Sequence, residues 1–455
     1  MTRLYNQHIV VAGAARSGVA VAELMQRKGA GVFVSDAGTI GEVFRERLES
    51  SGIPYEQGGH SDRSLEGDFL VLSPGVPGDA PIVRAYEDAG KQVLAEIEVA
   101  SWFCESRIVA VTGSNGKTTV VNWLADIWKR AGRSFLLAGN VGTAFSEVVE
   151  TSSAETDVIL EVSSFQLDHI DRFRARVAIL LNITPDHLNR YQNRFEHYIA
   201  SKMQLPGHQS EEDTLIYGYD DLVVREQVEK MALQTAHPEL LPFSSEIEVP
   251  GACLRDGIMR IQTKTHNEEV LPMDQLALPG KHNLRNGLAV ALAARVCEID
   301  KGPIRDSLTG FEGVPHRLQK VRELGGVTYY NDSKATNVNA VWYALTSFRR
   351  PVILIMGGRD KGNDYRELYD EVREKVKAVI AIGEGRDAIQ EQLRGVAPVI
   401  WLADSMQDAV YKSYLKAEKG DIVLLSPACA SFDMFESYEE RGHKFIQVVM
   451  TLQEE

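Results

Sequence analysis

The stretch VTGSNGKTTV, Val111 to Val120, has the residue types of a phosphate-binding loop. It joins an apolar run typical of a buried strand to a helical pattern that begins near Lys117. At a helix N-terminus, backbone N–H groups hold phosphate oxygens, a lysine reaches the β and γ phosphates, and a hydroxyl such as that of Thr118 can ligate magnesium. The standard loop has its first glycine where Val111 stands, whereas this loop starts at Gly113. A plain glycine turn with a surface lysine is the alternative, but the order of strand, loop and helix favours binding of ATP or GTP.

Polar side chains follow two later apolar runs. TDVILEVSSFQL places Glu161 at the end of a predicted strand, the position expected of an acid that handles magnesium. ARVAILLNITPDHLNRY releases Asp186 and His187 into a predicted loop. A histidine alone in a loop is more often an ordinary surface residue, so this one gains a role only from its context.

A second glycine turn lies near the N-terminus, in HIVVAGAARSGVAVAELMQRKGAGVFVSD. An apolar strand, Ile9 to Ala12, leads into the turn Gly13 to Gly18, an amphipathic helix and a second strand that ends at Asp36. Asp36 stands where an acid meets a ribose hydroxyl in dinucleotide-binding domains, but Ala15 replaces the middle glycine of their fingerprint. The alternatives are a tight turn without a ligand and a nicotinamide oxidoreductase, which would leave Lys117 unused.

Composition limits the classes of protein that fit. The 455 residues suggest about three domains at roughly 150 residues each. A net charge of −15 argues against a nucleic-acid scaffold, so we expect no nucleic-acid partner. The cysteines are widely spaced and predict neither a zinc site nor a disulfide framework. Neither a signal peptide nor an apolar run of about 18 residues occurs, so we expect a cytoplasmic protein without membrane insertion.

The alternation of apolar strands, turns and helices predicts the α/β class, with three Rossmann-like domains in series and a central P-loop-type ATPase domain. Glycines and a proline interrupt the periodicity around GFEGVPHRL, residues 310–318, and indicate a boundary there. Four short apolar strands follow it, in VTYYN, PVILIMG, AVIAIG and DIVLLS. We expect domains at 1–97, 98–312 and 313–455.

A series of motifs resembles the Mur ligase family, which also includes folylpolyglutamate and cyanophycin synthetases. In chain order they are TGSNGKTT, GNVG at Gly139, EVSSFQL at Glu161, NITPDHLNRY at Asn182, HNLRN at His282, PHR at Pro315, DSKATN at Asp332, GGRDKG at Gly357 and LSPACASFDMF at Leu424. Each is weak alone, but their order along nearly the whole chain is specific. One departure is Asn189, where the branch that this chain resembles usually has aspartate.

DHLNRY, DSKATN and SPACASFD together resemble the branch that adds D-glutamate to UDP-N-acetylmuramoyl-L-alanine, and the DNPR-like motif of branches that add lysine or diaminopimelate is missing. The resemblance implies that ATP converts a carboxylate into an acyl phosphate, from which an amine displaces phosphate. Another ligase of the family, including a folylpolyglutamate synthetase, and a nucleotide-binding regulator without ligation remain alternatives.

The resemblance also implies the site residues. Catalysis would rest on Lys117, His187 and Lys202, with Lys202 carbamylated. Two magnesium ions would be held by Thr118, Glu161, His187 and Lys202. ATP would contact Gly113, Ser114, Asn115, Gly116, Lys117, Thr118, Thr119, Asn283, Asn286, Arg317 and Asp332. The UDP-linked substrate would contact Gly13, Ala14, Ala15, Arg16, Ser17, Asp36, Ser73, Gly75 and Asn140. D-Glutamate would contact Lys334, Thr336, Lys361, Ser426 and the backbone near Phe432. We expect a monomer in which ATP bridges the last two domains and catalysis involves domain closure.

Overall fold

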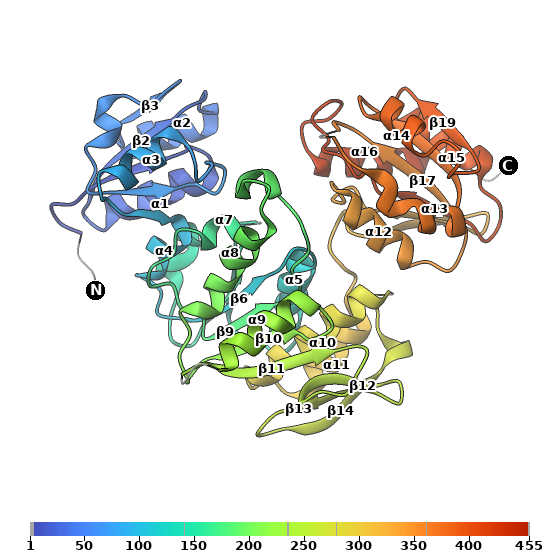
Figure 1. The fold of residues 1–455 in the computed structure, drawn as a ribbon, viewed down its shortest axis with the longest axis horizontal. Helices are drawn as coiled ribbons and strands as arrows, with labels where there is room; N and C mark the ends of the chain where they lie inside the picture. Colours follow the sequence, from blue (N-terminus) through green and yellow to red (C-terminus); the bar gives the residue numbers. More distant parts are fainter. Residues whose placement is uncertain (1–3, 141, 234–235, 279, 361, 454–455) are drawn as a thin grey trace. The chain divides into compact units, whose positions relative to one another are not determined.

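The computed structural model describes residues 4–140, 142–233, 236–278, 280–360 and 362–453, which contain three β-sheets (Figure 1). One compact unit consists of Met1–Leu276 and Arg285–Gly310 and contains two of the sheets, and the other consists of Ala277–Leu284 and Phe311–Glu455. The predicted α/β class with three Rossmann-like domains is confirmed, whereas the boundaries at 97/98 and 312/313 stay a prediction. None of the helices in the described ranges has the length and apolarity needed to cross a bilayer.

The N-terminal sheet has five parallel strands in the order β3-β2-β1-β4-β5. Its strands are β1 (His8–Ala12), β2 (Gly31–Asp36), β3 (Tyr55–Gln57), β4 (Phe69–Leu72) and β5 (Val93–Ala95), and its helices are α1 (Arg16–Arg27), α2 (Glu42–Ser50), α3 (Pro81–Asp88) and α4 (Glu96–Ser101). The inner strands are continuous apolar runs because helices cover both faces. Ala12 pairs with both Ser35 and Leu72, so the turns after these strands meet at one edge.

The central sheet has nine strands in the order β14-β13-β12-β11-β10-β9-β6-β8-β7. They are β6 (Arg107–Thr112), β7 (Phe135–Gly139), β8 (Asp157–Glu161), β9 (Val177–Leu180), β10 (Thr214–Gly218), β11 (Glu239–Ser244), β12 (Gly251–Arg255), β13 (Ile258–Gln262) and β14 (Asn267–Pro272). The helices are α5 (Lys117–Arg130), α6 (Phe145–Val148), α7 (Ser164–Leu167), α8 (Phe195–Gly207), α9 (Leu222–Ala232), α10 (Lys281–Val296) and α11 (Lys301–Gly310). β13 pairs antiparallel with both β12 and β14, and the last two strands, β13 and β14, which were not predicted from the sequence, extend an otherwise parallel sheet.

The register of the central strands places the predicted site residues at the carboxyl ends of neighbouring strands. Glu161 pairs with Val111 and with Gly139, and Thr112 pairs with Leu180. The segments that follow β6, β7, β8 and β9 therefore emerge side by side, as ligand-binding loops do in parallel α/β sheets.

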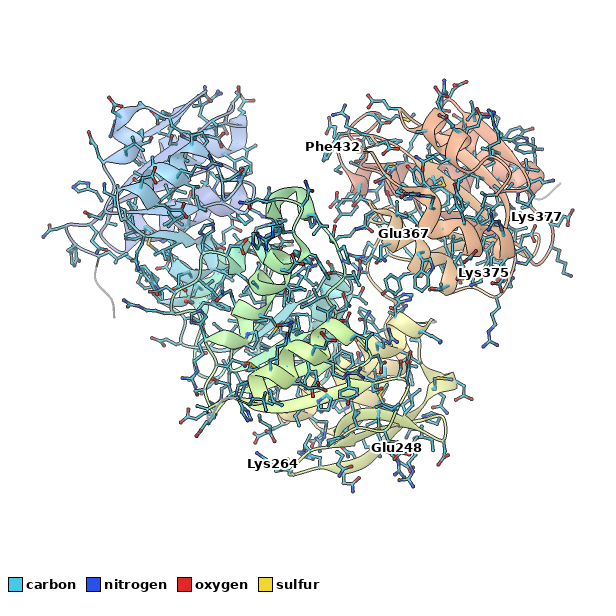
Figure 2. All side chains as sticks on the ribbon, viewed as in Figure 1. Glu248, Lys264, Glu367, Lys375, Lys377 and Phe432 are labelled. Carbon is cyan, nitrogen blue, oxygen red and sulfur yellow. The ribbon has the colours of Figure 1, made fainter. Side chains whose placement is uncertain are left out.

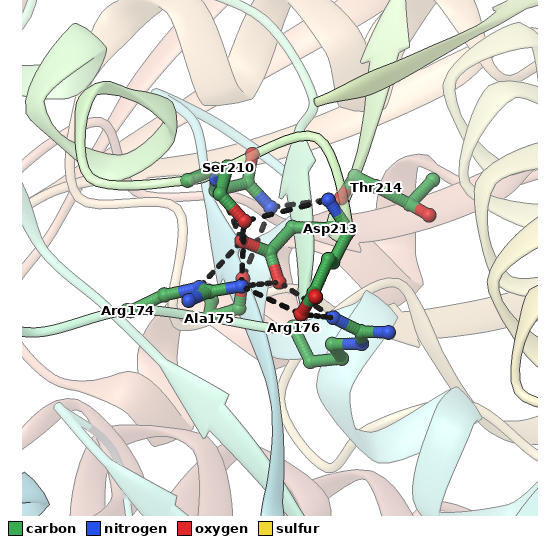
Figure 3. Close-up of polar contacts among 8 residues, drawn as sticks. Arg174, Ala175, Arg176, Ser210, Asp213 and Thr214 are labelled. Atoms are coloured by element: carbon green, nitrogen blue, oxygen red, sulfur yellow. Dashed lines mark hydrogen bonds and ion pairs between the residues drawn. The ribbon is translucent and has the colours of Figure 1, made fainter. Parts of the chain in front are cut away.

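At the amino ends of the central strands lies a polar cluster around Asp213 (Figure 3). Its buried carboxylate binds Arg174 Nε at 2.6 Å and Arg176 Nη1 at 3.3 Å, and accepts the Ser210 N–H at 2.7 Å. Because these residues precede β9 and β10, the cluster holds the amino ends of two strands whose carboxyl ends face the predicted site.

The C-terminal sheet has the order β15-β16-β20-β17-β18-β19, with only β15 antiparallel. Its strands are β15 (Gln319–Leu324), β16 (Val327–Asn331), β17 (Val352–Gly357), β18 (Val376–Ile382), β19 (Ile400–Ala403) and β20 (Ile422–Leu425), and its helices are α12 (Val338–Thr346), α13 (Tyr369–Lys375), α14 (Arg386–Gln392), α15 (Met406–Lys416) and α16 (Tyr438–Thr451). The four predicted strands are present as β16, β17, β18 and β20, and two further strands, β15 and β19, were not predicted. Both are edge strands: β15 is rich in charged residues, and β19 is a four-residue apolar segment at the far edge of the sheet.

Candidate active site

The phosphate loop has a backbone that only glycine adopts without strain. Gly116 is the N-cap of α5 with φ +91°, and a Cβ there would lie 2.7 Å from Asn286 Oδ1. Gly113 has φ +157°, and its Cβ would lie 3.0 Å from Leu181 Cβ. The Asn182 side chain holds the loop between them, accepting the Asn115 N–H at 2.8 Å and donating to the Asn115 carbonyl at 3.0 Å. The loop is thus preformed by the segment after β9 and by α10.

Two lysines meet at one carbonyl of this loop. Lys117 Nζ donates to Gly113 O at 2.7 Å and to Ser114 O at 3.1 Å, and Lys202 Nζ donates to the same Gly113 oxygen at 2.9 Å. Lys202, on α8, is only 1% exposed, and its ammonium lies 4.7 Å from the centre of the Tyr198 ring. Burial, followed by the positive charge of Lys117, holds the pKa of Lys202 well below its ordinary value. A lysine on a helix is ordinarily exposed, whereas the fold buries this one.

Glu161 supplies a buried anionic oxygen that lacks a protein donor. The residue is 2% exposed at the end of β8, and its Oε1 accepts the Asn140 side-chain N–H at 3.3 Å. Its Oε2 is buried without a hydrogen-bond partner. A buried carboxylate oxygen in this state fits a divalent cation, and the nearby loop offers the buried Thr118 hydroxyl as a second ligand type. Within the described ranges no three His, Cys, Asp or Glu side chains cluster as a complete metal site.

His187 projects from the loop after β9 in a left-handed conformation, with φ +52°. Its side chain is 55% exposed, its Nε2 lies 3.6 Å from Asp186 Oδ2, and its ring packs edge-on against Phe165 at 5.1 Å. It is therefore accessible to a ligand at the edge where the phosphate loop and Glu161 emerge.

Arg190 links this loop to the N-terminal sheet. Its guanidinium lies 4.1 Å from the centre of the Phe165 ring and donates to the carbonyls of Pro74 and Gly75, each at 3.2 Å. A cavity lies at this junction. It is lined by Leu72, Ser73, Pro74, Val76, Gly78, Ala95, Phe165, Gln166, Asp168, His169 and Arg190. Ser73 and Pro74 of the predicted substrate loop thus border a cavity that is also lined by α7 and by the loops on either side of β9.

The glycine turn after β1, Asp36 and Ser73 lie close together. Asp36 Oδ2 accepts the Ala14 N–H at 2.6 Å, and Asp36 Oδ1 accepts the Gly38 N–H at 2.8 Å. A Cβ at Gly13, which has φ +89°, would lie 3.0 Å from Ser73 Cβ. The Asp36 carboxylate therefore holds the turn after β1, through Ala14, to the turn after β2, through Gly38. The sequence did not reveal this structural role.

In the second unit, Asp332 follows β16 and is 6% exposed. Its carboxylate accepts the Ser426 hydroxyl at 2.8 Å and the Leu318 N–H at 3.2 Å, and burial raises its pKa to about 7. Ser426 is fully buried and its hydroxyl is engaged by Asp332. The neighbouring Arg317 has a buried Nε without a hydrogen-bond partner, which leaves a donor for a ligand.

The two loops after β16 and β20 are tied together. The Ala428 N–H donates to Ala335 O at 2.9 Å, with Ala428 at φ +60°. The buried Arg441 guanidinium donates to Ser333 O at 2.8 Å and to Cys429 O at 3.0 Å. These bonds hold the predicted amino-acid loops as one surface.

The remaining predicted amino-acid contacts differ in exposure. The Lys334 ammonium lies 5.3 Å from the centre of the Tyr438 ring, and Thr336 is exposed. Phe432 is 62% exposed on the loop after β20 (Figure 2). Lys361 lies outside the described residues.

Several residues that shape the site were not among the residues predicted from the sequence. The quoted motif NITPDHLNRY contains Asn182 and Arg190, and Tyr198 follows it by seven residues. Their roles could not be predicted, because they depend on partners that are distant in the chain. Arg441 lies outside every quoted motif, and nothing local to it predicted burial.

Comparison with known proteins finds similarity along nearly the whole chain. Family models described as MurD N-terminal domain, Mur ligase middle domain, and Mur ligase, glutamate ligase domain match residues 9–82, 111–294 and 316–429. A UDP-N-acetylmuramoylalanine--D-glutamate ligase from Salinibacter ruber is 47% identical over 447 residues, which cover 97% of each chain. A ligase of the same name from Christiangramia forsetii is 41% identical, covering 98% of this chain and 99% of its own. A solved UDP-N-acetylmuramate-alanine ligase from Thermotoga maritima covers 98% of this chain and 100% of its own with a TM-score of 0.60, and at 16% identity it supports the fold alone.

Proposed function

The chain belongs to the UDP-N-acetylmuramoylalanine--D-glutamate ligases of the Mur ligase family, and we propose that it joins D-glutamate to UDP-N-acetylmuramoyl-L-alanine with cleavage of ATP to ADP and phosphate. Similarity over the full length of relatives with that name supports the choice of substrates over those of other family members. The observation that carries the reaction type is the shortened phosphate loop, on which Lys117 and Lys202 meet beside the buried carboxylate of Glu161.

In the first step, a carboxylate oxygen of the alanyl group attacks the γ phosphorus of ATP. The bond to the β–γ bridging oxygen breaks, ADP leaves, and an acyl phosphate forms. Negative charge spreads over the phosphoryl oxygens in the transition state, so fixed donors and cations lower the barrier. The backbone N–H groups of residues 113–119 and the Lys117 ammonium would supply them.

In the second step, the amine of D-glutamate attacks the acyl carbon. Phosphate leaves with the electron pair of the acyl C–O bond, and the amine nitrogen loses its extra proton to water or a nearby base. The accessible His187 and the Asn140 amide lie on segments that emerge beside the phosphate loop, and we assign them to orienting the acyl phosphate. The loop Ser73–Gly75 and the turn Gly13–Gly18 would hold the UDP-linked substrate.

Magnesium fits the residues of this site. Thr118, Glu161, His187 and a modified Lys202 would hold two ions, which neutralise charge on the phosphate oxygens when bound. Without a cation, the buried Glu161 Oε2 has no partner, so the protein residues favour the loaded state.

Lys202 is suited to carbamylation. Its lowered pKa provides the neutral amine, whose nitrogen forms a bond to the carbon of carbon dioxide while one N–H proton is released to solvent. The product is an anion, which suits a site beside a second lysine and divalent cations better than an ammonium does.

The dicarboxylate acceptor needs cations and donors in a protein of strongly negative net charge. We propose that Lys334, Thr336, Lys361, Ser426 and the backbone near Phe432 bind D-glutamate, with Ser426 acting within the tied loops. Asn283, Asn286, Arg317 and Asp332 would bind the adenosine and phosphates of ATP. We place the reaction in the cytoplasm, in the synthesis of peptidoglycan precursors.

Phosphate release from ATP tests the proposal when it is measured with each acceptor and each amino acid in turn. Release should require both UDP-N-acetylmuramoyl-L-alanine and D-glutamate. Preference for a folate acceptor, or for L-lysine or diaminopimelate, would show a different ligase, and release independent of any amino acid would show a nucleotide-binding regulator.

A further inference from the structure

Arg285 lies in HNLRN, between the proposed adenine contacts Asn283 and Asn286. We infer that Arg285 is a positioning residue that sets the choice of nucleotide base, an inference that rests on the proposed use of ATP. Nothing in the reaction requires a charge at this position of α10, so its contacts indicate what it does.

The Arg285 side chain is anchored on two loops at the carboxyl edge of the central sheet. Its Nε lies 3.0 Å from Asp220 Oδ2 and donates to Ser245 Oγ at 3.1 Å, and its Nη2 donates to Glu246 Oε1 at 2.8 Å. Asp220 follows β10, and Ser245 and Glu246 follow β11. One guanidinium therefore joins the first turns of α10 to two neighbouring strands.

The anchor itself is rigid. The Asp220 side chain is 5% exposed, whereas that of Arg285 is 31% exposed. The Asp220 carboxylate also accepts the Ser245 N–H at 2.9 Å, the Ser245 hydroxyl at 2.8 Å and the Ser244 hydroxyl. Hydrogen bonds to a partly buried charge are stronger and better directed than those between neutral groups.

Fixing one side chain of a helix fixes the rotation of the helix about its axis, because successive residues are held about 100° apart. The next residue, Asn286, is 6% exposed, and its Oδ1 would lie 2.7 Å from a Cβ on Gly116. The Arg285 anchor therefore determines how the Asn286 amide stands against the phosphate loop.

The orientation of that amide matters for base choice. A side-chain amide has a donor NH2 group and an acceptor oxygen. At position 6 adenine carries an amino donor, whereas guanine carries an oxygen acceptor. An amide held in one orientation can hydrogen-bond only one of the two bases, whereas an amide that can rotate by 180° can hydrogen-bond either. When a site is built to hydrogen-bond one ligand, it binds much more weakly any ligand whose donors and acceptors do not match.

A matched control lies on the same helix. Arg295 forms an ion pair with Glu268, with Arg295 Nε 2.6 Å from Glu268 Oε1, and its side chain is 10% exposed. It is an arginine of α10 anchored to a carboxylate on β14, but it lies ten residues from Arg285 and nine from Asn286, which is about two and a half helical turns.

The test is calorimetric titration of ADP and GDP into the intact chain with magnesium, for the parent and for Arg285→Leu, Arg285→Lys and Arg295→Leu. The parent should prefer ADP. We expect Arg285→Leu to lose at least tenfold of that preference, mostly through weaker ADP binding. Arg285→Lys, which retains the charge but not the fork of donors, should lose at least threefold. Arg295→Leu should unfold at a lower temperature and keep the parent's preference.

An unchanged ADP-to-GDP ratio in folded Arg285→Leu would overturn the inference, as would an equal loss in Arg295→Leu. If Arg285→Leu does not fold, an unchanged ratio in Arg285→Lys overturns it. The proposed function fails separately, if the parent does not release phosphate from ATP in the presence of both substrates.

Discussion

Replacement of Gly116 by alanine tests whether the phosphate loop is shaped by contact with α10. Gly116 has φ +91°, and its Cβ would lie 2.7 Å from Asn286 Oδ1 and 3.2 Å from Leu181 Cδ1. The left-handed backbone costs about 1–2 kcal/mol for alanine, and forcing a methyl group into a packed site costs about 1–3 kcal/mol. We expect Gly116→Ala to lose about 2–5 kcal/mol of unfolding free energy as the sum of these two costs, and to lose ADP binding because the loop must shift.

Gly132 provides the matched control at the other end of α5. It has φ +66° with nothing within 4 Å of a Cβ, so Gly132→Ala should lose only the backbone cost of about 1–2 kcal/mol and bind ADP as the parent does. The assays are urea unfolding at 25 °C and titration of ADP. In the double variant Gly116→Ala/Asn286→Ala, the contact is relieved, so the second substitution should cost less than Asn286→Ala alone. Equal losses for Gly116→Ala and Gly132→Ala, or strict additivity in the double variant, would refute the reasoning.

Four further perturbations test the site. Lys117→Ala should reduce phosphate release by at least about 100-fold, the scale of one preorganised catalytic contact, with circular dichroism unchanged; near-normal turnover would contradict its role. Lys202→Ala should lose most activity, regain part of it with small carboxylates, and lack the carbon-13 carbamate signal that labelled bicarbonate gives in the parent; an active parent without that signal would exclude carbamylation. Burial raises the pKa of Asp332 to about 7, so the contribution of this group to stability is complete below about pH 4 and is lost as the pH rises through 7. Asp332→Asn should flatten this part of the plot of unfolding free energy against pH. An unaltered plot would show that Asp332 does not titrate there. Thr336→Ala should raise the KM for D-glutamate about tenfold, the equivalent of one lost hydrogen bond to a charged ligand, while the KM for ATP stays constant; equal changes in both would argue against an amino-acid contact.

Local sequence predicted the elements that carry the chemistry. A strand, a glycine-rich turn and a helix can be identified from residues close together in the chain, because apolar periodicity and backbone freedom are local properties. The phosphate loop, the Gly13–Gly18 turn and the position of Glu161 at the end of β8 were predicted in this way. The edge strand β15 and the antiparallel pair β13 and β14 were missed, because charged and polar residues interrupt their apolar pattern.

The sequence by itself thus determined which residues could bind phosphate, and the order of the strands and turns that present them. Tertiary structure decided which of those residues are buried, paired or left without a partner. Lys202 appears in the sequence as a helix-surface residue, yet the fold buries it against Gly113, 89 positions earlier. Arg285 has no local signal at all, since its partner Asp220 is 65 positions away. Burial and ion pairing depend on which segments the fold brings together, and no short stretch of sequence contains that information.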